Sequence, residues 1–132
     1  MSAILAVSSL LENDAALIAV VPAARQFAGL IPQGTALPAL AITSVSTVRW
    51  QGITGDNFCA ERVQVTAMAA TYPQQKQVLA LVRAALPRRP GTVNTVQVDS
   101  ILKDTTGPDF RNDGVDPPIF MGEQDFLVRY SE

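Results

Sequence analysis

The segment Glu61–Leu86 constrains the fold most, because its apolar pattern changes period at one point. From Arg62 to Ala70 apolar and polar residues alternate, which is typical of a β-strand with one buried face. Tyr72-Pro73 ends this pattern, and proline suits the first turn of a helix, where its missing N–H would have no partner anyway. From Gln74 to Leu86 the apolar residues follow a helical stripe. A strand that leads directly into a covering helix predicts a two-layer α+β unit.

The other predicted elements are placed around this unit by the same two periodicities. Helical spacing predicts a helix over Ala3–Leu11 and, after a cap at Asn13-Asp14, a short one over Ala15–Val21. Alternation predicts strands over three further ranges: Pro38–Trp50, Thr92–Lys103 and Ile119–Tyr130. The glycine- and proline-containing segments between them are predicted connections: Ala23–Leu37, Gln51–Phe58 and Asp104–Pro118.

The predicted fold class is therefore α+β. Residues 1–132 form a single two-layer domain, in which a mostly antiparallel sheet of about four strands is packed by an N-terminal and a central helix, in the order α-β-β-α-β-β. A chain of 132 residues is long enough to bury one sizeable core.

Several details of these elements can be predicted from individual side chains. In the strand Pro38–Trp50, four apolar residues share one parity but are interrupted by Ser44 and Ser46, which indicates a bulge or a half-exposed middle: Leu40, Ile42, Val48 and Trp50. Val96, Val98 and Leu102 form the predicted buried side of the next strand, and Gly122 marks a possible bulge in the last one. Three apolar residues of the first long connection are expected to pack on the core: Phe27, Leu30 and Ile31.

Composition excludes several classes of function. The sequence has no histidine, which removes the Ser-His-Asp and Cys-His arrangements and the commonest zinc ligand. Cys59 is the single cysteine, so we expect a semi-buried structural residue, no internal disulfide and a reducing compartment. No apolar run is long enough to span a bilayer, and the net charge of −2 argues against a general DNA-binding protein. No glycine-rich phosphate loop occurs, and we expect neither a cofactor nor catalytic activity.

Three short charged patterns have simpler structural interpretations. Asp109–Gly114 resembles a calcium loop, but Arg111 stands among the ligand positions, so a turn at Asn112-Asp113-Gly114 is favoured. Glu123 and Asp125 share one face of a strand, which a glycosidase could use but which also suits an acidic edge that prevents strand pairing. Arg88-Arg89 could contact phosphate, although positive charge is also favourable at the solvated end of a helix.

Charge is unevenly distributed along the chain. The sum is −1 up to Ala60, +4 from Glu61 to Lys103 and −5 from Asp104 onward. A basic middle and an acidic end could pair within one molecule, or between neighbours in a head-to-tail ring, where Arg88 and Arg89 would contribute.

Taken in order, several segments resemble the tail terminator or tail completion proteins of long-tailed bacteriophages, also called head-to-tail joining proteins. The resemblance rests on four segments: the N-terminal helix ending LLENDAALIAVV, the strand beginning at Leu37-Pro38, the strand-then-helix Glu61–Leu86, and the closing strand Gln124–Tyr130. It covers most of the chain, apart from Ala23–Thr35 and Asp104–Pro118.

This resemblance implies a non-enzymatic virion protein, assembled in the cytoplasm of a bacterial host. Six copies would form a ring on the head-proximal end of the tail tube, end tube elongation and join the head connector, while DNA passes through the lumen without specific binding. The alternative is another neck, connector or tail-tube-related protein of the particle. A free-standing monomeric binding module is a third reading. We expect partner or neighbour contacts at loops that carry aromatic and charged residues: Trp50, Phe58, Arg88, Arg89, Phe110, Arg111 and Asp113.

Overall fold

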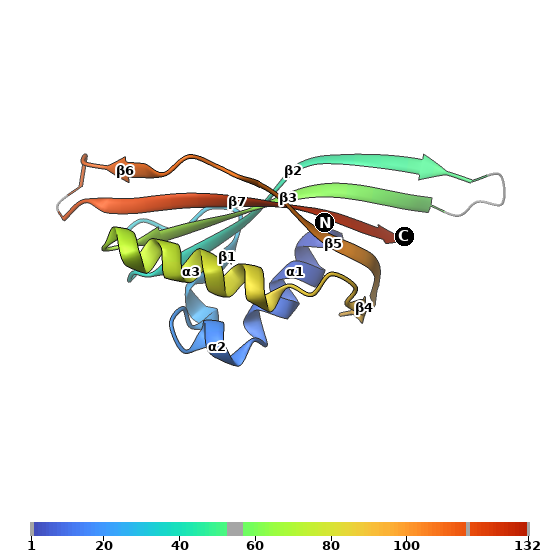
Figure 1. The fold of residues 1–132 in the computed structure, drawn as a ribbon, viewed down its shortest axis with the longest axis horizontal. Helices are drawn as coiled ribbons and strands as arrows, with labels where there is room; N and C mark the ends of the chain where they lie inside the picture. The colour runs from blue at the N-terminus through green and yellow to red at the C-terminus, as the bar shows by residue number, and fades with distance from the viewer. Residues whose placement is uncertain (1, 53–56, 116, 132) are drawn as a thin grey trace.

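Three strands of 13 residues each dominate the computed structural model: β2 (Ala39–Gln51), β3 (Asn57–Ala69) and β7 (Ile119–Ser131). The structure describes residues 2–52, 57–115 and 117–131. β3 lies between β2 and β7 and pairs with both of them in antiparallel orientation. Figure 1 shows them spanning the long axis of the molecule, with the helices below.

Shorter strands extend this sheet on both sides. They are β1 (Gln26–Ala28), β4 (Gly91–Val93), β5 (Val96–Thr106) and β6 (Phe110–Asn112). The described strands form one seven-stranded sheet in the order β1-β2-β3-β7-β5-β4, and β6 pairs with β7. Only β1 joins its neighbour in parallel among these pairs.

The helices cover one face of the sheet. They are α1 (Ser2–Glu12), α2 (Ala15–Ile18) and α3 (Tyr72–Ala85), with a 3₁₀ turn η1 (Ala23–Arg25) before β1. As predicted, Asp14 caps α2, with its Oδ2 accepting from the backbone N–H of Leu17 at 3.0 Å. The core lies between the layers: alternate residues of β3, such as Val63 and Val65, are fully buried beneath Val78 and Val82 of α3.

The predicted α+β class and the strand-then-helix centre are confirmed, and the four predicted strands correspond to β2, β3, β5 and β7. The three strands missed are only three residues long. One of them breaks the predicted strand Thr92–Lys103, because Asn94 and Thr95 have φ angles of 47° and 67° and form a tight hairpin turn between β4 and β5. Such turns usually carry a glycine, so Asn-Thr gave no signal.

Bulges change which side chains are buried. The predicted bulge in β2 is confirmed between Ser44 and Ser46. Because the extra residue reverses the alternation, Ile42 lies in the core whereas Val48 and Trp50, of the same parity, are 52% and 54% exposed. In β5 a shift between Val98 and Ser100 likewise buries Ile101 in place of the predicted Leu102.

Other predictions about the connections need correction. Leu30 was expected to pack on the core but is 89% exposed, because the chain turns away after β1 at Gly29, whose φ is 99°. The segment Asp104–Pro118 is not an unstructured loop, since β5 continues to Thr106 and β6 pairs with β7. The favoured turn within it is present: the backbone N–H of Gly114 donates to Asn112 Oδ1 at 2.9 Å.

The hairpin predicted over Gln51–Phe58 is confirmed by the pairing of Gln51 with Asn57, although residues 53–56 of its connection lie outside the described residues. The interpretation of Glu123 and Asp125 as an acidic sheet edge is wrong, because β7 is a central strand. Both carboxylates accept instead from Gln64 Nε2 on β3, at 3.2 and 3.1 Å.

Gly122 does not mark a bulge, since β3 and β7 pair without interruption there. It makes room for Gln75 of α3, whose side chain is fully buried against β7. A Cβ atom at position 122 would lie 1.4 Å from Gln75 Nε2 and 3.0 Å from Leu79 Cδ1. The missing side chain therefore sets how closely α3 approaches the sheet.

We expect Gly122→Ala to lower the free energy of unfolding by about 1–3 kcal/mol, because the new methyl group must displace a buried side chain. Urea denaturation measures the loss. In the double variant Gly122→Ala/Gln75→Ala the clash is removed, so the loss should be smaller than the sum of the two single losses. Additive losses would show that the fit between Gly122 and Gln75 is not the constraint.

Asp109 fixes the connection between β5 and β6 to helix α3. Its carboxylate accepts from Tyr72 OH and from Lys76 Nζ, each at 2.7 Å, and from Gln75 Nε2 at 3.5 Å. These hydrogen bonds, that to Lys76 first, lower the pKa of Asp109 below its ordinary value of 3.8, and the bond to Asp109 raises the pKa of Lys76. A carboxyl group whose pKa is lowered by folding stabilises the fold at pH values above its ordinary pKa. That stabilisation is lost as the pH falls through the pKa of the folded state.

We therefore expect Asp109→Asn to unfold at a lower urea concentration than the wild type at pH 7. The two midpoints should converge only at pH values below the lowered pKa of Asp109 in the folded state, where the wild-type carboxyl is protonated too. Asp99→Asn, at an exposed position of β5, is the control for charge alone. A difference between Asp109→Asn and wild type that stays constant with pH would contradict the assignment.

Candidate interaction surfaces

The first candidate surface is the end of the β2–β3 hairpin, Ser46–Gln51 and Asn57–Arg62, which we call the arm. Trp50 lies directly opposite Phe58 in the strand register, and Val48 lies two residues before Trp50 on the same side. Alternate residues of β3 face the helices, so Phe58 and its partner point to the helix-free face. Trp50 and Phe58 remain 54% and 48% exposed.

The second candidate surface is β6 with the turn that follows it, Phe110–Val115, which we call the tip. Phe110 is 60% exposed and Val115 39%. Arg111 Nε and Asp113 Oδ1 form an ion pair at 2.6 Å, and the Arg111 guanidinium lies 5.5 Å from the centre of the Phe120 ring. In Figure 1 β6 lies at the opposite end of the sheet from the arm.

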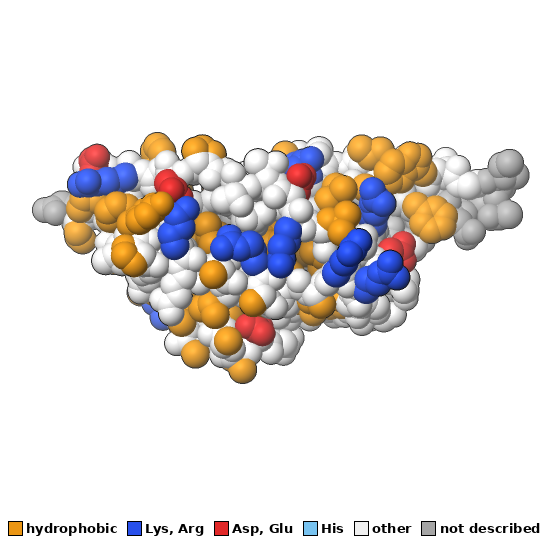
Figure 2. All heavy atoms as spheres, in the orientation of Figure 1, with side chains coloured by type: hydrophobic (Ala, Val, Ile, Leu, Met, Phe, Trp, Pro, Cys, Tyr) orange, Lys and Arg blue, Asp and Glu red, His pale blue; other side chains and the backbone are white. Residues whose placement is uncertain are grey.

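The third candidate surface is a row of basic residues over α3, its exit and β5, visible in Figure 2 as a band of lysine and arginine side chains across the molecule. It comprises Lys76 and Arg83 of α3, Arg88 and Arg89 of the linker that follows, and Lys103 of β5. Lys76 pairs with Asp109 at 2.7 Å. The other four make no ion pair with a carboxylate in the part of the chain that the structure describes.

The seven sequence-predicted contact residues thus fall into three separate groups. The structure brings Trp50 together with Phe58, places Phe110 beside the Arg111–Asp113 pair, and leaves Arg88 and Arg89 exposed at the end of α3.

Several contributors were not singled out from the sequence, among them Val48 and Lys103. Val48 was hidden because its parity pointed to the core, and Lys103 because it was expected to lie in an ordinary strand. Ser44 and Ser46, which interrupt the apolar alternation of this strand, were the sequence signal that could have revealed the exposure of Val48.

In the middle of the helix-free face, charged side chains pair with one another. Arg62 pairs with Asp104 and, at 3.6 Å, with Asp125. Together with the bonds from Gln64 to Glu123 and Asp125, this network leaves the two ends of the face as the apolar regions.

A cluster of side chains suited to metal binding is not found among the described residues. No three of the His, Cys, Asp and Glu residues there come together as metal ligands would. The buried Tyr130 donates to Glu61 Oε1 at 3.1 Å, and burial raises the pKa of Tyr130. Cys59 is buried, more completely than predicted. No helix in the described ranges is long and apolar enough to cross a membrane.

Comparison with known proteins adds two findings. A solved structure of the virion of a native gene transfer agent (GTA) particle contains a chain of the same fold. It aligns with a TM-score of 0.73 and 15% sequence identity, over 100% of this chain and 95% of that one. A search among curated proteins finds no match.

The sequence also matches the family described as tail completion protein gp17, over residues 5–130. The matched range includes most of α1, all of α2 and α3, and the described strands up to Tyr130 of β7. The chain therefore belongs to the tail completion protein gp17 family, whose members are structural virion proteins and not enzymes.

Proposed function

We propose that this tail completion protein forms a closed ring, of six copies, on the head-proximal end of the phage tail tube. The ring ends tube elongation and provides the surface that joins the head connector. Its partners are then the tail tube protein, the connector and further copies of itself. The family match supports this proposal, as does the whole-length likeness to a chain of a gene transfer agent virion.

The observation that carries the proposal is the exposed apolar face of the arm. Trp50, Phe58 and Val48 are each about half exposed although they lie side by side in a regular hairpin. Grouped aromatic residues on a surface are typical of protein interfaces, where they supply much of the binding energy. An arm that extends past the helices can place this face on a neighbouring copy or on the tube (Figure 1).

The two ends of the sheet favour a ring over a simple pair. The arm and the tip carry different residues, so a contact between copies that uses these ends joins unlike surfaces. Unlike surfaces repeat around an axis and close when the rotation permits, whereas like surfaces give a dimer.

The charge of the chain is compatible with a lumen through which DNA passes. A net charge of −2 gives no general attraction for phosphate, and strong attraction would hinder sliding.

The direct test is electron microscopy of particles made without this protein. We expect tails of uncontrolled length, or finished tails beside unjoined heads. Normal tails joined to heads would rule out the proposed role. Light scattering on the purified protein should show a ring as a discrete assembly of about six copies. If the protein were a neck protein with another role, the micrographs should show tails of normal length.

The arm gives a sharper test. We expect Trp50→Ser/Phe58→Ser to stay folded, with a stability loss of about 1 kcal/mol from the lost cross-strand pair. It should fail to restore joined particles when it replaces the wild-type protein. Leu30→Ser removes an apolar residue that is more exposed but lies off the arm, and should behave as wild type. Full restoration by the arm variant would contradict an interface at the arm.

A further inference from the structure

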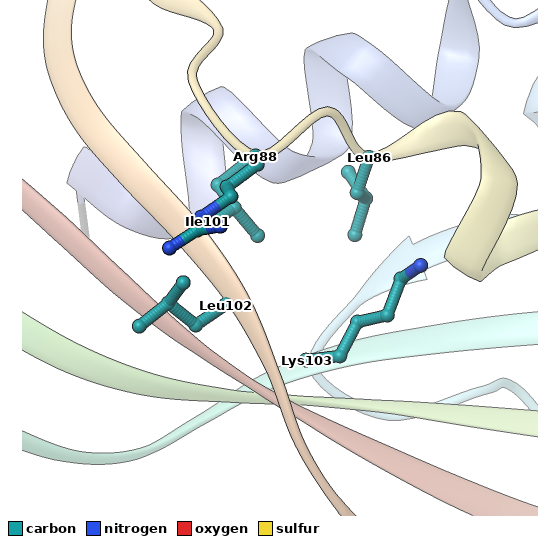
Figure 3. Close-up of a pocket in the computed structure, with 5 residues that line it drawn as sticks. All are labelled: Leu86, Arg88, Ile101, Leu102 and Lys103. Atoms are coloured by element: carbon teal, nitrogen blue, oxygen red, sulfur yellow. The ribbon is translucent and has the colours of Figure 1, made fainter.

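A hollow lies between the end of α3 and strand β5, within the basic row. It has a volume of about 370 Å³ and is lined by Leu86, Arg88, Ile101, Leu102 and Lys103. Figure 3 shows that the lining comes from three places: the end of α3, the linker that follows it, and β5. The backbone N–H of Ile101 donates to the carbonyl of Arg88 at 2.8 Å, which ties the linker to the strand and fixes the shape of the hollow.

The lining combines an apolar floor with a cationic rim. Leu86 and Ile101 are almost fully buried, whereas Arg88 and Lys103 are exposed and make no ion pair with a carboxylate in the described part of the chain. Such a lining suits a ligand that presents an apolar side chain next to a carboxylate. The phosphate backbone of DNA would match the rim, but it has nothing to place against the floor.

The tip of this same chain has the required chemistry. Phe110 is 60% exposed, and the side chain of Asp113, three residues later, is 68% exposed. Asp113 pairs with Arg111, but an exposed pair of this kind contributes little and can exchange partners. The arm fits less well, because its acidic residue in the described range, Glu61, is buried and accepts a hydrogen bond from Tyr130.

The tip of one molecule points away from its own hollow. Figure 1 places β6 at one end of the sheet, beyond the start of α3, whereas the hollow lies at the other end of that helix. The occupant must therefore come from another molecule.

We propose that the tip of one copy docks in the hollow of the next, with Phe110 on Leu86 and Ile101, and Asp113 between Arg88 and Lys103. This proposal rests on the ring proposed above and names its subunit contact. The contact joins two unlike surfaces, so each copy uses both and the assembly continues around an axis. The acidic end and the basic middle of the sequence then pair between molecules.

The experiment uses two variants of the whole chain in sedimentation velocity. In Arg88→Glu/Lys103→Glu the hollow is defective, and in Phe110→Ala/Asp113→Ala the tip is defective. Each should associate at least about tenfold more weakly than the wild type, the charge reversal by repulsion and the truncation by loss of the aromatic anchor. An equal mixture should form 1:1 dimers and nothing larger, because one variant keeps only its tip and the other only its hollow.

Arg129→Glu, at an exposed position of β7, is the charge control. It reverses one charge, as each of the two substitutions in the hollow does, but Arg129 neither lines the hollow nor belongs to the basic row. Two results together support a specific charged contact. This variant should associate as the wild type does, and wild-type association should weaken when the salt is raised from about 0.1 M to 0.5 M.

A second measurement tests the contact in the case that the wild-type chain forms a closed ring only when it is bound to the tail. In a Cys59→Ala background, Lys103→Cys and Asp113→Cys placed in one chain should give disulfide-linked multimers in assembled particles. Absence of these cross-links, with hollow variants that assemble as wild type does, overturns the proposed contact.

Three further outcomes separate this inference from its alternatives. If Arg88→Glu/Lys103→Glu loses retention on DNA while assembly is unchanged, the basic row is a nucleic-acid surface and the docking proposal is wrong. If particles lacking the protein have normal joined tails, the ring role fails, whatever the sedimentation results are. If those particles are defective but the hollow and tip variants restore them fully, the role stands and this contact fails.

Discussion

The uninterrupted pairing of β3 with β7 is the constraint on which the rest of the structure depends. It runs from Phe58 opposite Ser131 to Ala69 opposite Phe120 without a shift in register. Every other part attaches to this pair: β2 to one strand, β5 and β6 to the other, and α3 across the face. A one-residue slip would turn Val63 and Val65 away from the helices, so burial on one face fixes the register.

The irregular features all lie outside this central pair. The register shifts seen in the described strands fall in β2 and β5, the two neighbours of the pair. Of the surfaces proposed for contact, the tip and the hollow lie outside this pair, and the arm includes Phe58 from the end of β3. A rigid centre with adaptable flanks suits a protein whose function is to present surfaces at fixed positions, and the family assignment is consistent with that.

The sequence predicted the parts of the fold that depend on long periodic segments. The strand-then-helix Glu61–Leu86 and the cap at Asp14 followed from local patterns of burial and hydrogen bonding. Strands of three residues could not be predicted, because they are stabilised by their partners and carry no period of their own. The candidate contact residues were chosen as large or charged residues near loops, but the hollow beside β5 depends on residues that only the tertiary structure brings together.

The bulge in β2 has a consequence for how the arm is aimed. Residues on either side of it keep their partners on β3, with Ser44 opposite Val63 and Ser46 opposite Arg62. A gain or loss of one residue between those two serines would be absorbed locally, changing the bend and twist of the strand and leaving Trp50 opposite Phe58. The direction of this hairpin and its surface chemistry are therefore separable: evolution can re-aim the arm toward a partner of different shape without changing the aromatic face.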